Sequence, residues 1–418
     1  MTSPTDMHCG LALRSYLAAT HLIPLVAKPI LRRRLKRGKE HPVRWQEKLG
    51  LRLAPRPDGP LIWIHAVGLG EVLSVRGLIA RLAAARPDLS FLVTSTTAAS
   101  ATVFAKHAPP RTLHQFLPLD APSYRRRFLD HFTPDLCVWV EQDLWPGLVS
   151  DLSARGTPQC IVAARMNATS HRSHQRAAAV YRDLYSAMAM ITAQDATTAA
   201  HLSALGADAI VTGSLKPAAD DLSCDPTELA QLSTQLADRF VWAVAPAHPE
   251  DNAHALAAHD RILKNDPSAL LIIAPRFPDA DIAVDGPCRS KGEGPHPDHP
   301  TWVCDTLGDL GLIYRLAQAA LIGGTFSDIE GHNPWEAAAL GCAILHGPRT
   351  AHFATDYSQL AAAGGAILVR TAEDSALALT SSALTETAAN ARHAKDTASK
   401  QTDTLALDLL RLCEGTYG

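Results

Sequence analysis

The chain has 418 residues, of which 47% are hydrophobic and 19% charged, and its formal net charge is −3. At roughly 150 residues per domain, this length predicts two or three domains, and the composition excludes a largely disordered chain. The near-neutral charge argues against nucleic acid as a partner of the whole molecule. The eight cysteines show no C-x-x-C spacing, and several lie in apolar runs. This pattern is typical of buried free thiols in a reducing compartment and argues against metal binding by cysteine.

The first 40 residues combine a short apolar run with a basic cluster. Residues 15–27 are mostly apolar, but a spanning helix needs about 20 apolar residues, and this run also contains His21 and Pro24. Arginines and lysines follow where a secretory signal would have small residues. We therefore expect residues 1–40 to be an amphipathic segment that binds an anionic lipid surface, to which each basic side chain contributes about 1 kcal/mol. The alternative is an ordinary surface helix packed on the first domain.

From residue 60 onward, short apolar runs alternate with helical stretches, a pattern typical of buried parallel strands. The expected strands of the first half are residues 61–65, 91–95, 136–140, 160–164, 190–192 and 209–213. Those of the second half are residues 240–244, 270–275, 301–304, 320–324, 343–347 and 366–369.

Each half is therefore predicted to be one doubly wound α/β domain, residues 41–218 and 219–418. Residues 286–300, rich in Pro, Gly and His, are expected to form an exposed loop of the second domain. Ligands of such sheets bind beyond the carboxyl ends of the strands, so we expect the two domains to face each other across a ligand-binding cleft.

Two glycines and an acidic residue follow the first expected strand. Gly68 and Gly70 would let a ligand approach backbone amides at a helix start. The dinucleotide fingerprint is incomplete because Leu73 replaces its third glycine, so a nicotinamide enzyme is disfavoured. Glu71 is either a general base or a carboxylate favoured by the helix dipole.

Acidic residues also follow the third expected strand, at Glu141 and Asp143. Two acidic side chains at this spacing suit chemistry on hydroxyls, but they suit helix capping equally well. The spacing leaves both alternatives open.

In the second half, a helix is expected to open within residues 331–336. Asn333 fits the N-cap, Pro334 the first helical position and Glu336 the third, so a capping box accounts for them without a function. The same helix start could hold a phosphate, with Arg276 as its cationic partner. The sequence contains no P-loop, G-x-S-x-G or H-E-x-x-H motif, so it gives no support to the common NTPase, esterase and zinc-protease classes.

Seven segments, in this order and over nearly the whole chain, resemble the 3-deoxy-D-manno-octulosonic acid (Kdo) transferase family. They are HAVGLGE (65–71), EQDLWP (141–146), AARMNATSHR (163–172), GSLK (213–216), PRFP (275–278), DTLGDLGLIY (305–314) and GGTFSDIEGHNPWEAAALG (323–341). The resemblance implies a two-domain GT-B glycosyltransferase that inverts the anomeric centre and uses neither a metal nor another cofactor. Its implied substrates are CMP-Kdo and a lipid A precursor (lipid IVA), in the synthesis of the lipopolysaccharide inner core. The implied location is the cytoplasmic face of the inner membrane, as a peripheral or monotopic protein.

The resemblance also assigns roles to residues. It implies that Glu71 is the catalytic base and that Glu141 and Lys216 stabilise the transition state. Donor contacts are implied at Pro275, Arg276, Leu307, Gly308, Asp309, Gly324, Thr325, Gly331, His332, Asn333, Pro334, Trp335 and Glu336.

The chain departs from the family pattern at four positions. Gly68 replaces a usual serine, Phe277 a usual histidine, and Asp143 and Asp309 usual glutamates. Two other classes of protein would share this scaffold. Another GT-B enzyme, such as a different transferase or a nucleotide-sugar epimerase, would lack the amphipathic start and the acidic LWP segment. A non-catalytic binding protein would tolerate the loss of Glu71.

Overall fold

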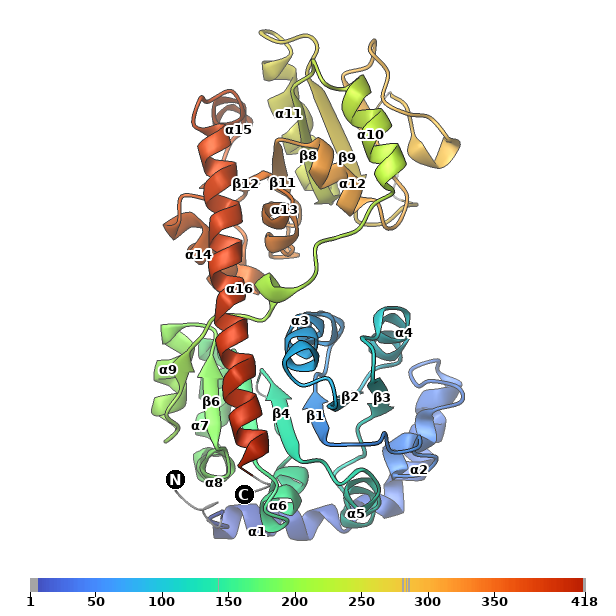
Figure 1. Cartoon of the computed structure of the whole chain (residues 1–418), viewed down its shortest axis with the longest axis vertical. Helices are drawn as coiled ribbons and strands as arrows, with labels where there is room; N and C mark the ends of the chain where they lie inside the picture. The colour runs from blue at the N-terminus through green and yellow to red at the C-terminus, as the bar shows by residue number, and fades with distance from the viewer. Residues whose placement is uncertain (1–6, 142, 280–281, 283, 285, 416–418) are drawn as a thin grey trace. The chain divides into compact units, whose positions relative to one another are not determined.

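The computed structural model describes residues 7–141, 143–279, 282, 284 and 286–415 (Figure 1). The chain divides into two compact units, the first formed by Met1–Ala219 with Lys400–Gly418 and the second by Asp220–Ser399. Each unit is built on one parallel sheet.

The sheet of the first unit has the order β3-β2-β1-β4-β5-β6-β7. Its strands are β1 (Leu61–His65), β2 (Ser90–Ser95), β3 (Thr112–Phe116), β4 (Leu136–Val140), β5 (Gln159–Ala164), β6 (Met190–Ala193) and β7 (Ile210–Val211). Its helices are α1 (Leu11–Thr20), α2 (Ile23–Lys36), η1 (Trp45–Leu49), α3 (Leu69–Ala85), α4 (Ala98–His107), α5 (Pro122–Phe132), α6 (Pro146–Ala154), α7 (Ala168–Gln175), α8 (Ala178–Ser186), α9 (Ala196–Ser203) and η2 (Lys216–Ala218).

Alternate side chains of the central strands enter two different cores. In β1, Ile62 and Ile64 pack with α3 on one face, whereas Trp63 packs with α5 and α6 on the other. Every residue of β1 and β4 is buried, as expected for strands covered on both faces. The apolar runs that predicted these strands are therefore explained by burial on both sides.

The N-terminal helices pack on the first unit along one face only. Leu13 of α1 lies in the core with α6 and α8, and the Tyr16 hydroxyl donates to Asp120 at 2.9 Å. Ala27 and Leu31 of α2 join a small cluster with η1. No described helix is both long and apolar enough to cross a membrane. Residues 1–6 of the predicted lipid-binding segment lie outside the described residues.

The sheet of the second unit has the order β10-β9-β8-β11-β12-β13. Its strands are β8 (Val241–Ala247), β9 (Leu270–Pro275), β10 (Thr301–Val303), β11 (Ala319–Ile322), β12 (Ala343–His346) and β13 (Ala366–Leu368). Its helices are α10 (Pro226–Gln235), α11 (Pro249–Ile262), η3 (Arg289–Lys291), α12 (Leu310–Leu316), α13 (Trp335–Ala339), η4 (Ala351–Phe353), α14 (Ala354–Ala362), α15 (Ala372–Leu379) and the first part of α16 (Leu384–Glu414).

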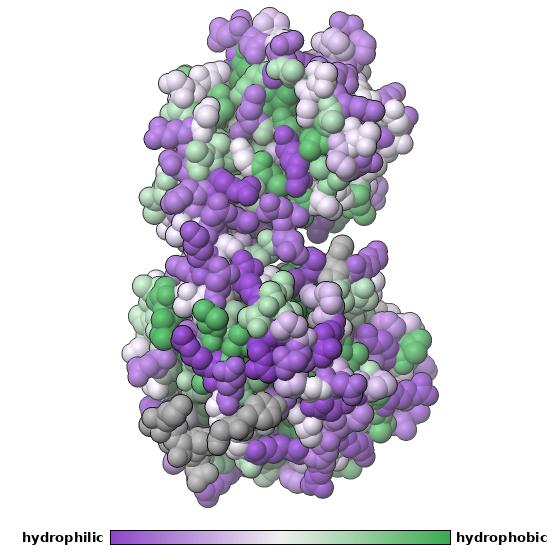
Figure 2. Space-filling model, viewed as in Figure 1, coloured by the Kyte–Doolittle hydropathy of each residue, from purple (hydrophilic) through white to green (hydrophobic). Residues whose placement is uncertain are grey.

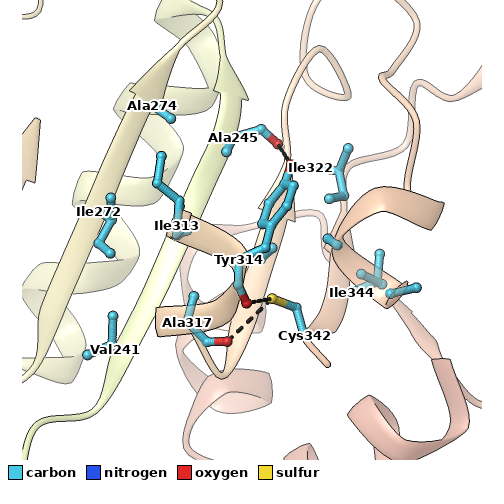
Figure 3. Packing of buried hydrophobic residues seen from close by; sticks show 14 of the residues in the cluster. Val241, Ala245, Ile272, Ala274, Ile313, Tyr314, Ala317, Ile322, Cys342 and Ile344 are labelled. Carbon is cyan, nitrogen blue, oxygen red and sulfur yellow. Dashed lines mark hydrogen bonds between the residues drawn. The ribbon is translucent and has the colours of Figure 1, made fainter. Parts of the chain in front are cut away.

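One core of this unit is organised around Tyr314 of α12 (Figure 3). Its hydroxyl donates to the carbonyl of Ala245 at 3.0 Å, and its own carbonyl accepts from the Cys342 thiol at 3.1 Å. Burial raises the pKa of that thiol to about 12, so Cys342 acts as a small apolar side chain with a weak donor.

The large apolar side chains lie mostly inside the units, and the face shown in Figure 2 has only scattered hydrophobic areas among hydrophilic ones.

The structure corrects one prediction about the domains and adds one strand. Residues 400–418 were expected in the second domain, but residues from Lys400 belong to the first unit, because Leu405 and Leu409 of α16 are buried in the core beside α3. The strand β3 was not predicted, and its Thr112, Leu113 and His114 are only half-buried at the edge of the sheet.

Candidate active site

Three residues with predicted catalytic roles line one pocket of the first unit. Glu71 enters it from the first turn of α3, Glu141 from the end of β4, and Lys216 from η2. The strands β1 and β4 are adjacent and parallel, so their carboxyl ends open at one edge of the sheet. The structure thus brings together residues that are far apart in the sequence.

Glu71 is the third residue of α3, and its carboxylate folds back over the N-cap, Gly68. Gly68 has φ −95° and ψ 176°, which any residue adopts, so its backbone does not require glycine. The space beside it is limited, because a Cβ on residue 68 would overlap Oε2 of Glu71 and the carboxylate would have to move. The Ser74 hydroxyl, which also lines the pocket, donates to the Glu71 carbonyl at 2.8 Å.

Glu141 occupies a strained backbone position. Its φ is +62°, and Ala163, which lines the same pocket at the end of β5, has φ +51°. Such left-handed conformations are unfavourable for residues other than glycine, at about 1–3 kcal/mol each, and they cluster at functional sites. Gln194 links the two residues, since its Nε2 lies 3.0 Å from the Ala163 carbonyl and 3.5 Å from Oε1 of Glu141.

The segment that carries Lys216 lies directly against α3. Gly77 of α3 touches the backbone of Ala218, and a Cβ on Gly77 would overlap the Ala218 carbonyl oxygen. Arg81, one turn further along α3, donates to the same carbonyl at 3.1 Å. This close approach fixes η2, and with it Lys216, beside the helix that presents Glu71.

The pocket concentrates charge of both signs. Burial raises the pKa of the Glu141 carboxyl, and the negative charge of Glu71 raises it further. Lys216 and Arg165 act in the opposite direction and lower it. A carboxylate beside a second carboxylate holds a proton more readily than an isolated one, as proton-transfer groups do.

In the second unit, the predicted donor residues gather beyond the strand ends. Arg276 follows β9 and donates its backbone N–H to the Ala247 carbonyl at 2.9 Å, and its guanidinium lies 5.4 Å from the centre of the Phe277 ring. His332 follows β11, and its Nε2 is 2.9 Å from Nε2 of His248, which follows β8. Because β9, β8 and β11 are neighbours in this order, Arg276, His248 and His332 share one edge of the sheet.

Two of the predicted donor residues have their polar groups engaged within the protein. The backbone N–H of Gly324 donates to Oδ2 of Asp251 at 2.6 Å. The hydroxyl of Thr325 is fully buried, donates to the Ile322 carbonyl and accepts from the Gly347 N–H, both at 2.8 Å. These contacts shape the turn after β11 and tie it to β12.

The helix predicted to open at Pro334 begins one residue later. The structure has α13 from Trp335, with Pro334 at the N-cap. Asn333 nevertheless caps it, since Oδ1 accepts from the Trp335 N–H and Nδ2 donates to Glu336, both at 3.1 Å. The predicted capping box is therefore not formed, although the Asn333 side chain accepts from the first helical N–H, so one of the amides proposed for a phosphate is already in use. Gly331, with φ +89°, turns the chain into this segment.

The segment Leu307, Gly308 and Asp309 follows β10. Leu307 is exposed and Gly308 has φ +100°, whereas the Asp309 carboxylate accepts from Arg289 at 3.0 Å. Arg289 also forms a two-fold hydrogen bond with Glu228, at 2.6 and 2.9 Å. These charged residues line a second recess, so the side chain of Asp309 is held by protein partners. Arg289 lies in the loop 286–300, which composition alone marked only as exposed.

Sequence reasoning did not single out Gln194 or His248. Both follow a strand directly, and that position was the available signal. Among the described residues, no group of three or more His, Cys, Asp or Glu side chains is placed to hold a metal ion.

The sequence of the chain is similar to those of known proteins. A sequence model of the 3-deoxy-D-manno-octulosonic-acid transferase (kdotransferase) family matches residues 43–219. The probable mitochondrial 3-deoxy-D-manno-octulosonic acid transferase of Arabidopsis thaliana is 34% identical over 360 residues, covering 81% of this chain and 80% of that protein. The 3-deoxy-D-manno-octulosonic acid transferase of Bordetella pertussis is 31% identical over 357 residues, covering 78% and 81%.

A solved structure of similar fold is that of UDP-GlcNAc 2-epimerase from Neisseria meningitidis bound to UDP-GlcNAc. It aligns with 84% of this chain and 99% of that chain, at a TM-score of 0.53 and 14% identity. This likeness concerns the fold alone. Together with the two parallel sheets, it confirms the predicted α/β class of GT-B type.

Proposed function

Because the chain belongs to the 3-deoxy-D-manno-octulosonic acid (Kdo) transferase family, we propose that it transfers Kdo from CMP-Kdo to a hydroxyl of a lipid A precursor. The observation that carries the proposal is the convergence of Glu71, Glu141 and Lys216 on one pocket at the carboxyl edge of the first sheet. An acceptor hydroxyl that enters this pocket meets two carboxylates and an ammonium group.

In the proposed reaction, Glu71 is the general base. The acceptor oxygen attacks the anomeric carbon of Kdo while its proton passes to the Glu71 carboxylate. The bond from the anomeric carbon to the phosphate oxygen breaks, and its electron pair leaves with CMP. One displacement of this kind inverts the anomeric centre.

The other pocket residues act on charge. Positive charge develops on the sugar as the leaving group departs, and the Glu141 carboxylate stabilises it, while Lys216 offsets the negative charge of the leaving group. The strained backbone at Glu141 supports such a role, because the fold holds this side chain in place at an energetic cost.

We propose that the nucleotide binds to the second unit at Arg276 and His332. A guanidinium forms charge-assisted hydrogen bonds to phosphate oxygens, and a neutral imidazole can donate one more. Leu307 and Gly308 are exposed residues that follow β10, at the same edge of the sheet, and would contact the nucleoside.

We also propose that α1 and α2 bind the cytoplasmic face of the inner membrane. The side of α2 that does not pack on the first unit exposes Leu25, Val26 and Ile30 at 75%, 52% and 52%. Leu22, just before α2, is 64% exposed. The same stretch carries Lys28, Arg32, Arg33, Arg34, Lys36, Arg37 and Lys39. Exposed apolar side chains next to a basic cluster are typical of segments that insert shallowly among anionic headgroups.

The test of the proposed reaction uses the full-length protein with CMP-Kdo and lipid IVA. The proposal predicts a product heavier by one or more Kdo residues in mass spectrometry, with inverted anomeric configuration by NMR. Incubation with UDP-GlcNAc instead of CMP-Kdo is the control for another nucleotide sugar. An unmodified acceptor with CMP-Kdo, or a product formed from UDP-GlcNAc, would contradict the proposal.

A further inference from the structure

The carboxylate of Asp251 is fully buried and accepts backbone N–H groups from two different loops. Asp251 is the third residue of α11. Its Oδ2 atom accepts from the N–H of His248 at 2.9 Å and from that of Gly324 at 2.6 Å, and its Oδ1 atom accepts from the N–H of Phe326 at 3.3 Å. His248 follows β8, whereas Gly324 and Phe326 follow β11. One carboxylate therefore ties together the ends of two neighbouring strands.

The loop after β11 is itself closed by backbone contacts. The carbonyl of Gly324 accepts from the N–H of Gly331 at 2.9 Å. The next residue is His332, whose Nε2 atom is 2.9 Å from Nε2 of His248. Because the backbone N–H of His248 is bonded to Asp251, these contacts close into a ring that passes through the carboxylate.

Close packing surrounds this ring of contacts. Gly323 lies so near the end of β8 that a Cβ on it would overlap the carbonyl oxygen of Pro246. The Phe326 ring stacks on the His254 ring of α11, with the centres 3.9 Å apart. A backbone N–H without an acceptor inside the protein is unfavourable, so loss of the Asp251 carboxylate would shift the loop after β11.

We propose that Asp251 is a positioning residue that fixes the loop carrying His332, because it takes up the N–H groups of Gly324 and Phe326. The proposal rests on the proposed function, in which Arg276 and His332 bind the phosphate of the nucleotide. The N–H groups of Gly324 and Phe326 already have a carboxylate as their anionic partner. The phosphate is therefore bound by side chains, and Gly324 contributes to the site through the position of the loop.

Hydrogen exchange in the full-length protein without nucleotide tests whether the carboxylate holds the loop. We expect the amides of residues 323–333 to exchange at least about 10-fold faster in Asp251→Ala than in the wild type, and formate, which replaces the deleted carboxylate, to restore their protection. Asp251→Asn keeps one oxygen acceptor and should be intermediate. The matched control is Asp374→Ala, at the third residue of α15, since that carboxylate accepts from the N–H groups of Arg370 and Thr371 at 2.9 Å. Unchanged exchange of residues 323–333 in Asp251→Ala, or equal acceleration there in the control, would overturn the proposal.

Binding of CMP, measured by calorimetry well below the Tm of each variant, tests the effect on the site. We expect Asp251→Ala to weaken binding by about 10-fold or more, because a displaced His332 loses its contact to the charged phosphate, and formate to restore most of the affinity. Asp374→Ala should keep wild-type affinity. Removal of a negative charge would by itself strengthen the binding of an anion, so weaker binding indicates a change in the position of the loop.

A lower Tm with unchanged or stronger CMP binding in Asp251→Ala would contradict the positioning role. If Asp251→Ala does not fold, Asp251→Asn decides, and wild-type exchange and affinity in that variant would overturn the proposal. If the wild type itself does not bind CMP, the assignment of the donor is wrong, and the exchange experiment still decides whether Asp251 fixes the loop.

Discussion

The carboxylate of Glu71 lies over Gly68, so closely that a Cβ on residue 68 would overlap Oε2 and lie 3.3 Å from Cδ. The glycine is one of the four positions at which the chain departs from the family pattern. Its backbone angles are ordinary, so the missing side chain matters for space and not for conformation. In this protein, Gly68 therefore sets the position of the proposed base.

Replacing Gly68 by alanine should displace the Glu71 carboxylate and leave the fold intact, because the carboxylate is the flexible end of its side chain. We expect transfer to fall by about 10–100-fold, as small misplacements of catalytic groups do, with little change in Tm. The matched control is Gly70→Ala, since a Cβ at Gly70 meets no atom within 4 Å. Equal rates for the two variants would contradict this account of Gly68.

Glu141→Gln should lower activity and raise stability, and the gain in stability should depend on pH. Burial raises the pKa of Glu141 in the folded protein above its unfolded value. At pH values where the carboxyl is protonated in both the folded and the unfolded state, Glu141 therefore does not lower the free energy of unfolding. As the pH rises through the two pKa values, the free energy of unfolding falls. Relative to the wild type, we expect the variant to have a higher Tm at pH 8 and little difference at pH 3.5, by calorimetry. If the Tm of the variant exceeded that of the wild type by more at low pH than at high pH, the direction assigned to the pKa shift of Glu141 would be wrong.

Arg276→Ala should weaken CMP binding because a charge-assisted hydrogen bond contributes about 1.5–3 kcal/mol, or roughly 10–100-fold in Kd. Calorimetry with CMP measures the effect directly. Arg261→Ala on α11 serves as the control, since the guanidinium of Arg261 contacts only the Ala257 carbonyl of its own helix among the described hydrogen bonds. Unchanged affinity in Arg276→Ala would move the phosphate site elsewhere.

Leu25→Glu with Val26→Glu should abolish binding to liposomes that contain anionic lipid, while the fold is kept because both side chains are exposed. Cosedimentation at low and high salt measures the binding, since the basic cluster adds an attraction that salt screens. Leu407→Glu on α16, at a position 52% exposed, is the control. Wild-type binding in the double variant would exclude this face of α2 as the lipid-binding surface.

The sequence predicted most of the fold because buried parallel strands leave a strong apolar signal. The runs 61–65 and 136–140 match β1 and β4 residue for residue. The edge strand β3 was missed because its sequence, TLHQF, has no apolar run. Its first three residues are only half-buried, so they need not be apolar. The end of α16 was assigned to the wrong unit because α16 is one continuous helix. Its sequence pattern does not show which core each part of the helix contacts.

The candidate site was predictable only in part. Glu71, Glu141 and Lys216 came from the resemblance, and the spacing alone left Glu71 and Glu141 equally open to structural roles. Gln194 and His248 were missed although each directly follows a strand, because their contacts join strands that are adjacent only in the folded sheet.

The most direct test of the account is the rate of Kdo transfer by Glu71→Gln. Glutamine keeps the shape of the side chain but cannot accept the proton, and general base catalysis is worth about 10²–10⁴-fold. The account predicts a variant with near-normal Tm and CMP affinity whose transfer to lipid IVA, followed by mass spectrometry, falls by about that factor. A variant that loses some stability but transfers Kdo at the wild-type rate would contradict it.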